Sequence, residues 1–478
     1  MIDEKQRTSD AFIDDARIAR ALDEGKRIAG DPEAVRKIIA KAALHKGLTA
    51  EETAVLLQVE DPALLNEMFT TASEIKKAIY GKRIVLFAPL YLSSHCVNNC
   101  VYCGYKLANK DQLRHRLSME ELRREVEIME SLGHKRLAVE AGEHPTLCPL
   151  EYVLDAIKEI YKVKRDNGDI RRVNINIAAT TIEDYQKLKA ANIGTYILFQ
   201  ETYHRPTYAK LHLGGPKRDY NWHTTAMDRA MKGGIDDVGI GVLYGLYDYK
   251  YETVAMFLHA EHLDQTFGVG PHTISVPRMR SAGNVDLNSF PYLVSDEEFK
   301  KVIAIIRMAV PYTGMILSTR EEPELRDELI ALGISQISAG SCTGVGGYQK
   351  VYVEHESTHN TNNGQQFEPS DQRSPNEIIR MLCQRGYIPS YCTACYRQGR
   401  TGDRFMPLAK SGEIQNVCLP NALLTFKEYL LDYADSETRA IGEKTLRDSL
   451  ETIPNEKVRA ITAERLQSME NGVRDLYF

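Results

Sequence analysis

Residues 83–103, RIVLFAPLYLSSHCVNNCVYC, place three closely spaced cysteines directly after an apolar, β-branched run. The run RIVLFAP predicts a buried β-strand, and Cys96, Cys100 and Cys103 form a C-x3-C-x2-C pattern in the loop that follows it. Structural zinc sites close with four ligands, whereas three thiolates can bind three irons of a cubane cluster and leave the fourth iron open. The stretch predicts an iron-sulfur site after a first strand, with zinc completed by His95 as the alternative.

The segment after this strand alternates short β-branched runs with amphipathic helical stretches. Two of the helices begin with capping boxes, Ser118-x-x-Glu121 and Ser295-x-x-Glu298. Seven further strand candidates follow at 135–142, 173–179, 195–201, 236–245, 272–278, 314–319 and 335–340. Eight strands that alternate with helices predict an α/β fold, a complete (β/α)8 TIM-type barrel with its chemistry at the carboxyl ends of the strands. An open doubly wound sheet is disfavoured because no G-x-G-x-x-G follows the first strand.

The remaining sequence predicts four units. Residues 1–82 have the three- and four-residue apolar spacing of helices, residues 83–354 form the barrel, and residues 355–375 are a polar linker or a strap across it. Residues 376–478 are predicted to be a mostly helical C-terminal domain that binds a second cluster.

Composition limits the partners. The net charge is −6, with 60 basic and 66 acidic residues and no long block of one sign, so we expect neither nucleic acid nor a membrane surface as a partner. No run of 18 apolar residues occurs, and residues 1–22 are charged throughout, which predicts a cytoplasmic protein with a small substrate.

A second set of three cysteines lies in the C-terminal region. Cys392, Cys395 and Cys418 form a C-x2-C-x22-C pattern, and residues 385–425 contain no histidine that could complete a zinc site. Three ligands again predict a cluster, and a zinc site completed from elsewhere in the chain is the alternative.

The first cysteine loop resembles that of the radical S-adenosylmethionine (SAM) superfamily, because an aromatic residue precedes the last cysteine after the first strand of a barrel. The resemblance implies a 4Fe-4S cluster on Cys96, Cys100 and Cys103, with SAM bound at the open iron and cleaved to a radical that abstracts hydrogen. Six residues lie where that superfamily contacts SAM: Tyr102, Gly142, Glu143, Gln200, Glu201 and Arg205.

The two cysteine sets together resemble the radical SAM tyrosine lyases that mature FeFe-hydrogenase. That family implies cleavage of the Cα–Cβ bond of L-tyrosine to p-cresol and dehydroglycine, and conversion of dehydroglycine to CO and cyanide for an iron carbonyl-cyanide unit. It also implies a second 4Fe-4S cluster on Cys392, Cys395 and Cys418, facing the first across the barrel interior. This cluster would carry an extra iron, bridged by a free cysteine and held by a histidine.

His272 is the candidate for this histidine, with His355 and His359 as rivals. The implied partners are scaffold proteins of hydrogenase maturation and an electron donor such as a ferredoxin or flavodoxin.

The carboxylate of a tyrosine substrate needs a cation, and arginine can bind it with two hydrogen bonds. Arg320, after the seventh strand, is the first candidate, although a salt bridge to Glu321 or Glu322 would compete; Arg278 and Arg280 are alternatives. Ser341, after the eighth strand, is expected to approach the substrate.

Two other functions remain open. A ThiH-like tyrosine lyase of the thiazole pathway would stop at dehydroglycine, and a non-catalytic iron-sulfur carrier would deliver metal without cleaving SAM.

Overall fold

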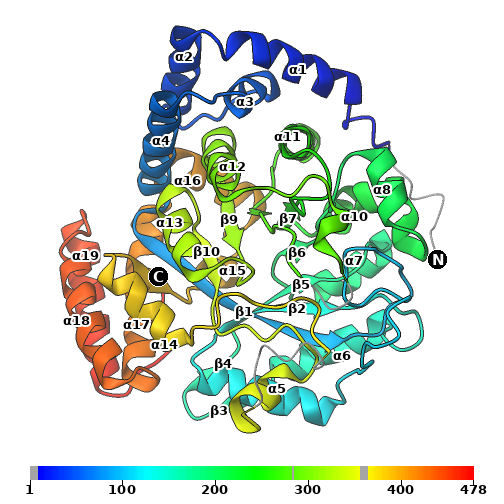
Figure 1. The fold of residues 1–478 in the computed structure, drawn as a ribbon. Coiled ribbons are helices and arrows are strands. Elements are labelled where there is room, and N and C mark those ends of the chain that lie inside the picture. Colours follow the sequence, from blue (N-terminus) through cyan, green and yellow to red (C-terminus); the bar gives the residue numbers. More distant parts are fainter. Residues whose placement is uncertain (1–8, 282–284, 356–363) are drawn as a thin grey trace.

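Eight parallel strands close into a barrel at the centre of the computed structural model, which describes residues 9–281, 285–355 and 364–478 (Figure 1). The strands are β1 (Arg83–Ser93), β2 (Arg136–Ala141), β5 (Arg172–Asn176), β6 (Tyr196–Ile197), β7 (Val238–Gly241), β8 (Thr273–Ser275), β9 (Gly314–Leu317) and β10 (Gln336–Ser338). β10 pairs with β1 in parallel, with Val85 opposite Gln336, and this pairing closes the ring. The predicted (β/α)8 barrel is confirmed, and each predicted run overlaps one of the strands, although β1 extends beyond its run to Ser93 and β5 begins one residue before its run, at Arg172.

Helices surround the barrel and bury the outer faces of the strands. They are α5 (Met119–Ser131), α6 (Leu150–Ile160), α7 (Ile182–Ala190), α8 (Arg205–Leu211), α9 (Tyr220–Thr224), α10 (Ala226–Lys232), α11 (Tyr249–Phe267), α12 (Asp296–Ala309) and α13 (Pro323–Leu332). Both predicted capping boxes are present, with Ser118 and Ser295 as the N-caps of α5 and α12. The core lies between these layers, where Leu86, Val139 and Ile175 are fully buried.

Four helices precede the barrel: α1 (Asp15–Ile28), α2 (Pro32–Ala42), α3 (Ala50–Leu57) and α4 (Pro62–Tyr80). α4 ends at Gly81, whose φ of 62° is a conformation that glycine adopts without strain. The helices lie on the outside of the barrel beside α11 and α12 (Figure 1).

The C-terminal region is mostly helical, as predicted, but it also contributes a ninth strand. Its elements are α14 (Pro375–Gln384), β11 (Ile388–Ser390), α15 (Ala394–Arg397), α16 (Gly402–Ser411), α17 (Gln415–Asp432), α18 (Ser436–Leu450) and α19 (Glu456–Glu470). β11 pairs in parallel with the first residues of β1, Arg83 opposite Ile388. This pairing fixes the loop with Cys392 at the amino ends of the barrel strands. The predicted division of the chain at residues 82, 354 and 375 stays a prediction.

Small two-stranded and turn elements complete the structure. β3 (Lys164–Arg165) and β4 (Gly168–Asp169) form an antiparallel pair, and residues Gln349–Val353 form a short π-helix. Within the described residues, every helix is too short or too polar to cross a membrane.

Candidate active site

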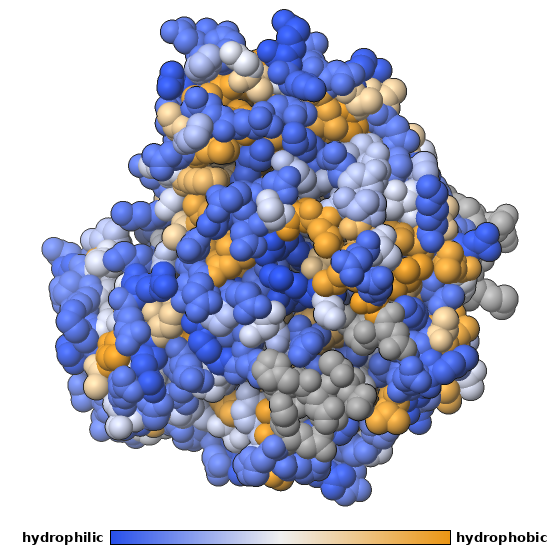
Figure 2. Space-filling model, viewed as in Figure 1, coloured by the Kyte–Doolittle hydropathy of each residue, from blue (hydrophilic) through white to orange (hydrophobic). Residues whose placement is uncertain are grey.

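A cavity of about 220 Å³ opens at the carboxyl ends of the barrel strands. Its walls come from most of the strands and from the loops that follow them, and the face drawn in Figure 2 is hollowed near its centre, where apolar side chains gather. The predicted residues that line the cavity are Cys96, Cys100, Tyr102, Cys103, Gly142, Glu143, Glu201, Arg280, Arg320 and Ser341.

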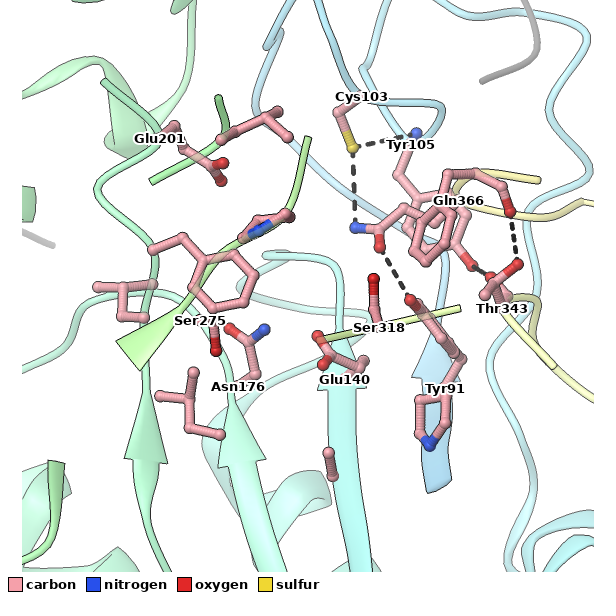
Figure 3. Close-up of a pocket in the computed structure, with 18 of the residues that line it drawn as sticks. Tyr91, Cys103, Tyr105, Glu140, Asn176, Glu201, Ser275, Ser318, Thr343 and Gln366 are labelled. Carbon is pink, nitrogen blue, oxygen red and sulfur yellow. Dashed lines mark hydrogen bonds between the residues drawn. The ribbon is translucent and has the colours of Figure 1, made fainter. Parts of the chain in front are cut away.

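The three cysteines of the first loop lie together at one end of this cavity. The Cys103 sulfur accepts hydrogen bonds from the Tyr105 backbone N–H at 3.4 Å and from the Gln366 amide at 3.9 Å (Figure 3). Burial raises the pKa of Cys103 to about 11 and raises the pKa of Cys100 further. Because these surroundings disfavour thiolates, a bound metal would have to supply the positive charge. Three sulfurs from one loop at one cavity fit a cluster held by three cysteines.

Two carboxyl groups beside the cysteines already have partners. Glu143 accepts a 2.5 Å hydrogen bond from the Asn98 amide, and Glu201 forms a 2.7 Å ion pair with Lys217. Next to them Gly142 permits close approach of the chain, because a Cβ at this position would lie 2.4 Å from the His95 carbonyl oxygen. The end of β2 therefore packs directly against the cysteine loop.

The other three predicted SAM contacts have other partners, and two of them lie away from the cavity. The Tyr102 hydroxyl lies 2.8 Å from His212 Nε2. The Gln200 amide donates to Thr224 Oγ1 at 2.8 Å, so its side chain is not among the described lining residues. Arg205 lies on α8, where it pairs with Asp10 and stacks on a tyrosine ring. Gln200 and Arg205 are therefore not among the residues that line the cavity, and their contact with SAM stays a prediction.

Arg320 is the arginine that faces the cavity without a carboxylate partner among the described residues. Glu321 instead accepts hydrogen bonds from Arg278 at 3.1 Å and from Arg280 at 2.5 Å. The Arg320 guanidinium stacks on Phe367, 3.5 Å from the ring centroid. The hydroxyl of Ser341 is buried at the cavity without a hydrogen-bond partner in the described part of the chain. Arg320 and Ser341 thus offer the cavity a cation and a hydroxyl that have no such partners among the described residues.

Several cavity residues were not predicted (Figure 3). Gln366 and Phe367 come from the middle of the predicted strap, and Gln366 accepts a 2.9 Å hydrogen bond from Tyr91. Glu140 and Asn176 line the cavity at the ends of β2 and β5. Glu140 lies three residues before Glu143 in EAGE, and the alternation of a strand could have indicated that it points into the barrel.

The second cysteine set lies at the opposite, amino end of the barrel. Cys392 follows β11, Cys395 lies on α15 and Cys418 lies on α17. The Cys392 carbonyl accepts a 2.7 Å hydrogen bond from Arg136, the first residue of β2. A hydrogen bond from Cys418 and the nearby Arg400 lower the pKa of Cys395 to about 6. The donors fit a second cluster, because two sulfurs are in contact and cations favour the thiolate form.

His272 lies beside this second set. Its Nε2 is 3.2 Å from the hydroxyl of Tyr396, the residue after Cys395, and its Nδ1 is 3.0 Å from the Asp237 carboxylate. Burial lowers the pKa of His272, which favours the neutral ring that binds metals. Of the rival histidines, His355 has a φ of 56° and His359 lies outside the described residues.

Zinc stays the alternative metal for both cysteine sets. Across residues 9–281, 285–355 and 364–478, no three His, Cys, Asp or Glu side chains converge as a site for one metal ion requires. A cluster distributes its cysteine ligands over several irons, so it does not need that convergence.

Two family models match consecutive parts of the chain. The profile of the radical SAM superfamily matches residues 90–260, and that of the biotin and thiamin synthesis associated domain matches residues 275–388. A crystal structure of HydG, a maturase of the FeFe-hydrogenase, is 63% identical, covers 98% of this chain and 100% of its own, and superposes with a TM-score of 0.93.

Two further relatives extend the comparison. The maturase HydG from Carboxydothermus hydrogenoformans is 40% identical, covers 95% of this chain and 98% of its own, and has a TM-score of 0.82. The 2-iminoacetate synthase of Salmonella typhimurium is 30% identical over 347 residues, which are 72% of this chain and 86% of that enzyme.

Proposed function

The chain belongs to the HydG family of radical SAM maturases of FeFe-hydrogenase, and on that premise we propose that it cleaves L-tyrosine to p-cresol and dehydroglycine and converts dehydroglycine to CO and cyanide. One observation carries the proposal: a single cavity has the three cysteines at one end and an uncompensated arginine, Arg320, in its wall. Such a cavity suits a small anionic substrate held next to a redox cluster.

Cys96, Cys100 and Cys103 would hold the 4Fe-4S cluster at which SAM binds. When bound, cluster and SAM supply the one-electron chemistry that generates a hydrogen-abstracting radical. Gly142 and Glu143 would contact the amino group of SAM, with Tyr102 and Glu201 beside it. Glu143 suits this role because its carboxylate lies in the wall next to the cysteine loop.

Arg320 and Ser341 would position the tyrosine. The guanidinium is planar and can bind a carboxylate with two hydrogen bonds, and the unpartnered Ser341 hydroxyl can accept from the substrate amino group. Phe367 covers the guanidinium and limits the access of water, which strengthens the ionic contact.

Cys392, Cys395 and Cys418, with His272, would hold the second cluster with its extra iron and a bridging free cysteine. The arginines around these thiols support the assignment, because they offset the charge of thiolates. The partners we propose are a scaffold protein of hydrogenase maturation, which would receive the product, and a ferredoxin or flavodoxin as the electron donor.

The test follows p-cresol and CO in one reaction of anaerobically reconstituted, reduced protein with SAM and L-tyrosine. We expect both products. The similarity to 2-iminoacetate synthase supports an alternative that stops at dehydroglycine, and p-cresol without CO would favour it. If neither product forms while SAM is intact, the lyase proposal fails and an iron-sulfur carrier becomes the better explanation.

A further inference from the structure

Three carboxyl groups line the cavity at the carboxyl ends of the strands, and only Glu140 lacks a strong partner. Glu143 is bound by Asn98 and Glu201 by Lys217. Among the described residues no ion pair reaches Glu140. The Glu140 carboxyl has the neutral side chain of Asn176 as a hydrogen-bond partner, so it keeps further hydrogen-bonding capacity for a ligand in the cavity.

Glu140 lies deep in the cavity, away from the cysteines. It is paired across the sheet with Asn176 on one side and Tyr91 on the other, so the three residues belong to one layer of the barrel. Figure 3 shows Cys103 and Glu201 at one end of the drawn pocket, and Glu140, Asn176 and Ser275 together at the other. A molecule next to the cysteines would extend its far end toward Glu140.

Apolar side chains form part of the cavity walls. Phe87, Ile177, Leu198 and Ile316 line the same cavity. Tyr91 is not free to serve as the polar contact, because its hydroxyl already donates to Gln366. The cavity therefore combines apolar side chains, which suit an aromatic ring, with polar groups at its depth, among which Glu140 is the carboxyl group without an ion pair in the described residues.

Burial supplies the second property of Glu140. It raises the pKa of this carboxyl to about 8, only partly offset by the neighbouring Asn176 and by Arg320. At neutral pH the Glu140 carboxyl is therefore protonated in most molecules, and in this form it can both donate and accept a hydrogen bond. A neutral acid of this kind matches a hydroxyl group better than it matches a charged group, because it loses little hydration when the ligand covers it.

We propose that Glu140 binds the phenolic hydroxyl of the tyrosine substrate and thereby sets the preference for tyrosine over phenylalanine. This inference rests on the proposed function, in which Arg320 holds the carboxylate of the same molecule. The phenolic end of tyrosine would then bind the acid Glu140 on β2, and its carboxylate would bind the cation Arg320 after β9.

The expected discrimination is large. A site built to hydrogen-bond a hydroxyl rejects the analogue without it, because the buried polar group is left unpaired, and factors of about 10⁴ or more are reached in such sites. For Glu140, which has Asn176 beside it as a partial substitute, we expect a preference of at least about 10²-fold for tyrosine.

The test measures the dissociation constants of tyrosine and phenylalanine by calorimetry, using anaerobically reconstituted protein loaded with SAM. In Glu140→Leu we expect the preference to fall by at least about 10²-fold, whereas Glu140→Gln, which keeps a donor and an acceptor, should retain most of it. Glu140→Ala replaces the leucine variant if that variant does not fold. The matched control is Glu130→Gln, a buried acid on α5 that lies outside the cavity and whose pKa burial raises to about 7.

The outcomes separate this inference from the proposed function. An unchanged preference in Glu140→Leu overturns the inference, as does a wild-type protein that binds the two amino acids equally. Loss of SAM affinity instead of tyrosine affinity in the variants would also overturn it, because Glu140 would then belong to the SAM contacts. The proposed function fails separately, if the wild type binds tyrosine with the expected preference and releases no p-cresol.

Discussion

The two cysteine sets use the same ligands, but the charges and hydrogen bonds around them differ. At the carboxyl end, Cys100 and Cys103 lie near Glu201, and burial raises their pKa values. At the amino end, burial also raises the pKa of Cys392, and the hydrogen bond to Cys395 together with burial raises the pKa of Cys418. The pKa of Cys395 is instead lowered to about 6, by the hydrogen bond from Cys418 and by the nearby Arg400 and Arg83. The difference teaches that a triad of cysteines does not by itself define a metal site, because the charges around it decide how much of the thiolate is stabilised by the protein.

The second difference is how each set is assembled. Three cysteines within eight residues come from one loop, so their proximity is dictated by the chain. Cys392, Cys395 and Cys418 meet only because β11 pairs with β1 and α17 packs beside it. The amino-end site thus depends on tertiary structure, and the carboxyl-end site depends on a local loop.

The largest effect is expected from Cys96→Ala, which removes one ligand of the loop set. We expect deoxyadenosine formation from SAM to fall by at least about 10³-fold, because a cluster held by two cysteines no longer presents one open iron in the cavity. The measurement is the amount of deoxyadenosine formed by reduced, reconstituted protein. Cys148→Ala, a cysteine outside both sets, is the control. Persistent deoxyadenosine would break the comparison, since the carboxyl-end set would then not be the radical site.

Cys395→Ala should separate the two ends. We expect p-cresol formation to stay within about twofold of wild type while CO release stops, because the amino-end ligands lie far from the cavity where tyrosine is cleaved. CO trapped by a haem protein and p-cresol measured in the same sample provide the readout. Unchanged CO would remove the second cysteine set from the reaction.

The barrel itself was predictable from residues 83–340, because every strand is a distinct β-branched run and helices such as α5 and α12 begin with a capping box. β11 was not, because its sequence, IPS, is three residues long and contains a proline. The cysteines of both sets were found by spacing alone. Arg205 and Gln200 show what a motif leaves open, because it fixes positions along the chain but not the partners, Asp10 and Thr224, that orient these side chains.

Gln366 illustrates what tertiary contact adds. It lies 263 residues from Cys103, yet its amide reaches that sulfur and its carbonyl accepts from Tyr91. No local pattern in the polar strap could have indicated which of its amides returns to the cavity. Glu140 was missed for a different reason, since its importance follows from the lack of an ion pair among the described residues, which only the assembled cavity reveals.

Arg136→Gln tests how far a nearby cation affects the amino-end cysteine set. Arg136 donates to the Cys392 carbonyl at 2.7 Å and is buried at the amino end. Loss of this charged hydrogen bond should cost about 1.5–3 kcal/mol of unfolding free energy, and loss of the cation should lower the reduction potential of the amino-end cluster by about 50 mV. An electrochemical titration followed by electron paramagnetic resonance measures the shift. The carboxyl-end cluster of the same sample is the internal control, and equal shifts at both would contradict a local effect of charge.

The smallest effect concerns how the C-terminal region docks at the amino end. His134, between α5 and β2, is fully buried, packs edge-on against Tyr391 and has no hydrogen-bond partner within the described residues. Burial lowers its pKa to about 3, from about 6.5 in an unfolded chain. The folded state must therefore keep this ring neutral, while the unfolded chain gains a proton as the pH falls below 6.5. The free energy of unfolding therefore falls on acidification, by about 1.4 kcal/mol between pH 7.5 and pH 5.5.

Urea unfolding of the wild type and of His134→Leu at both pH values measures this loss of stability, because the contributions of the other titrating groups cancel in the difference between the two proteins. If both proteins lose the same stability on acidification, the ring is hydrated or hydrogen-bonded in solution, and the amino end is less tightly packed than the carboxyl end.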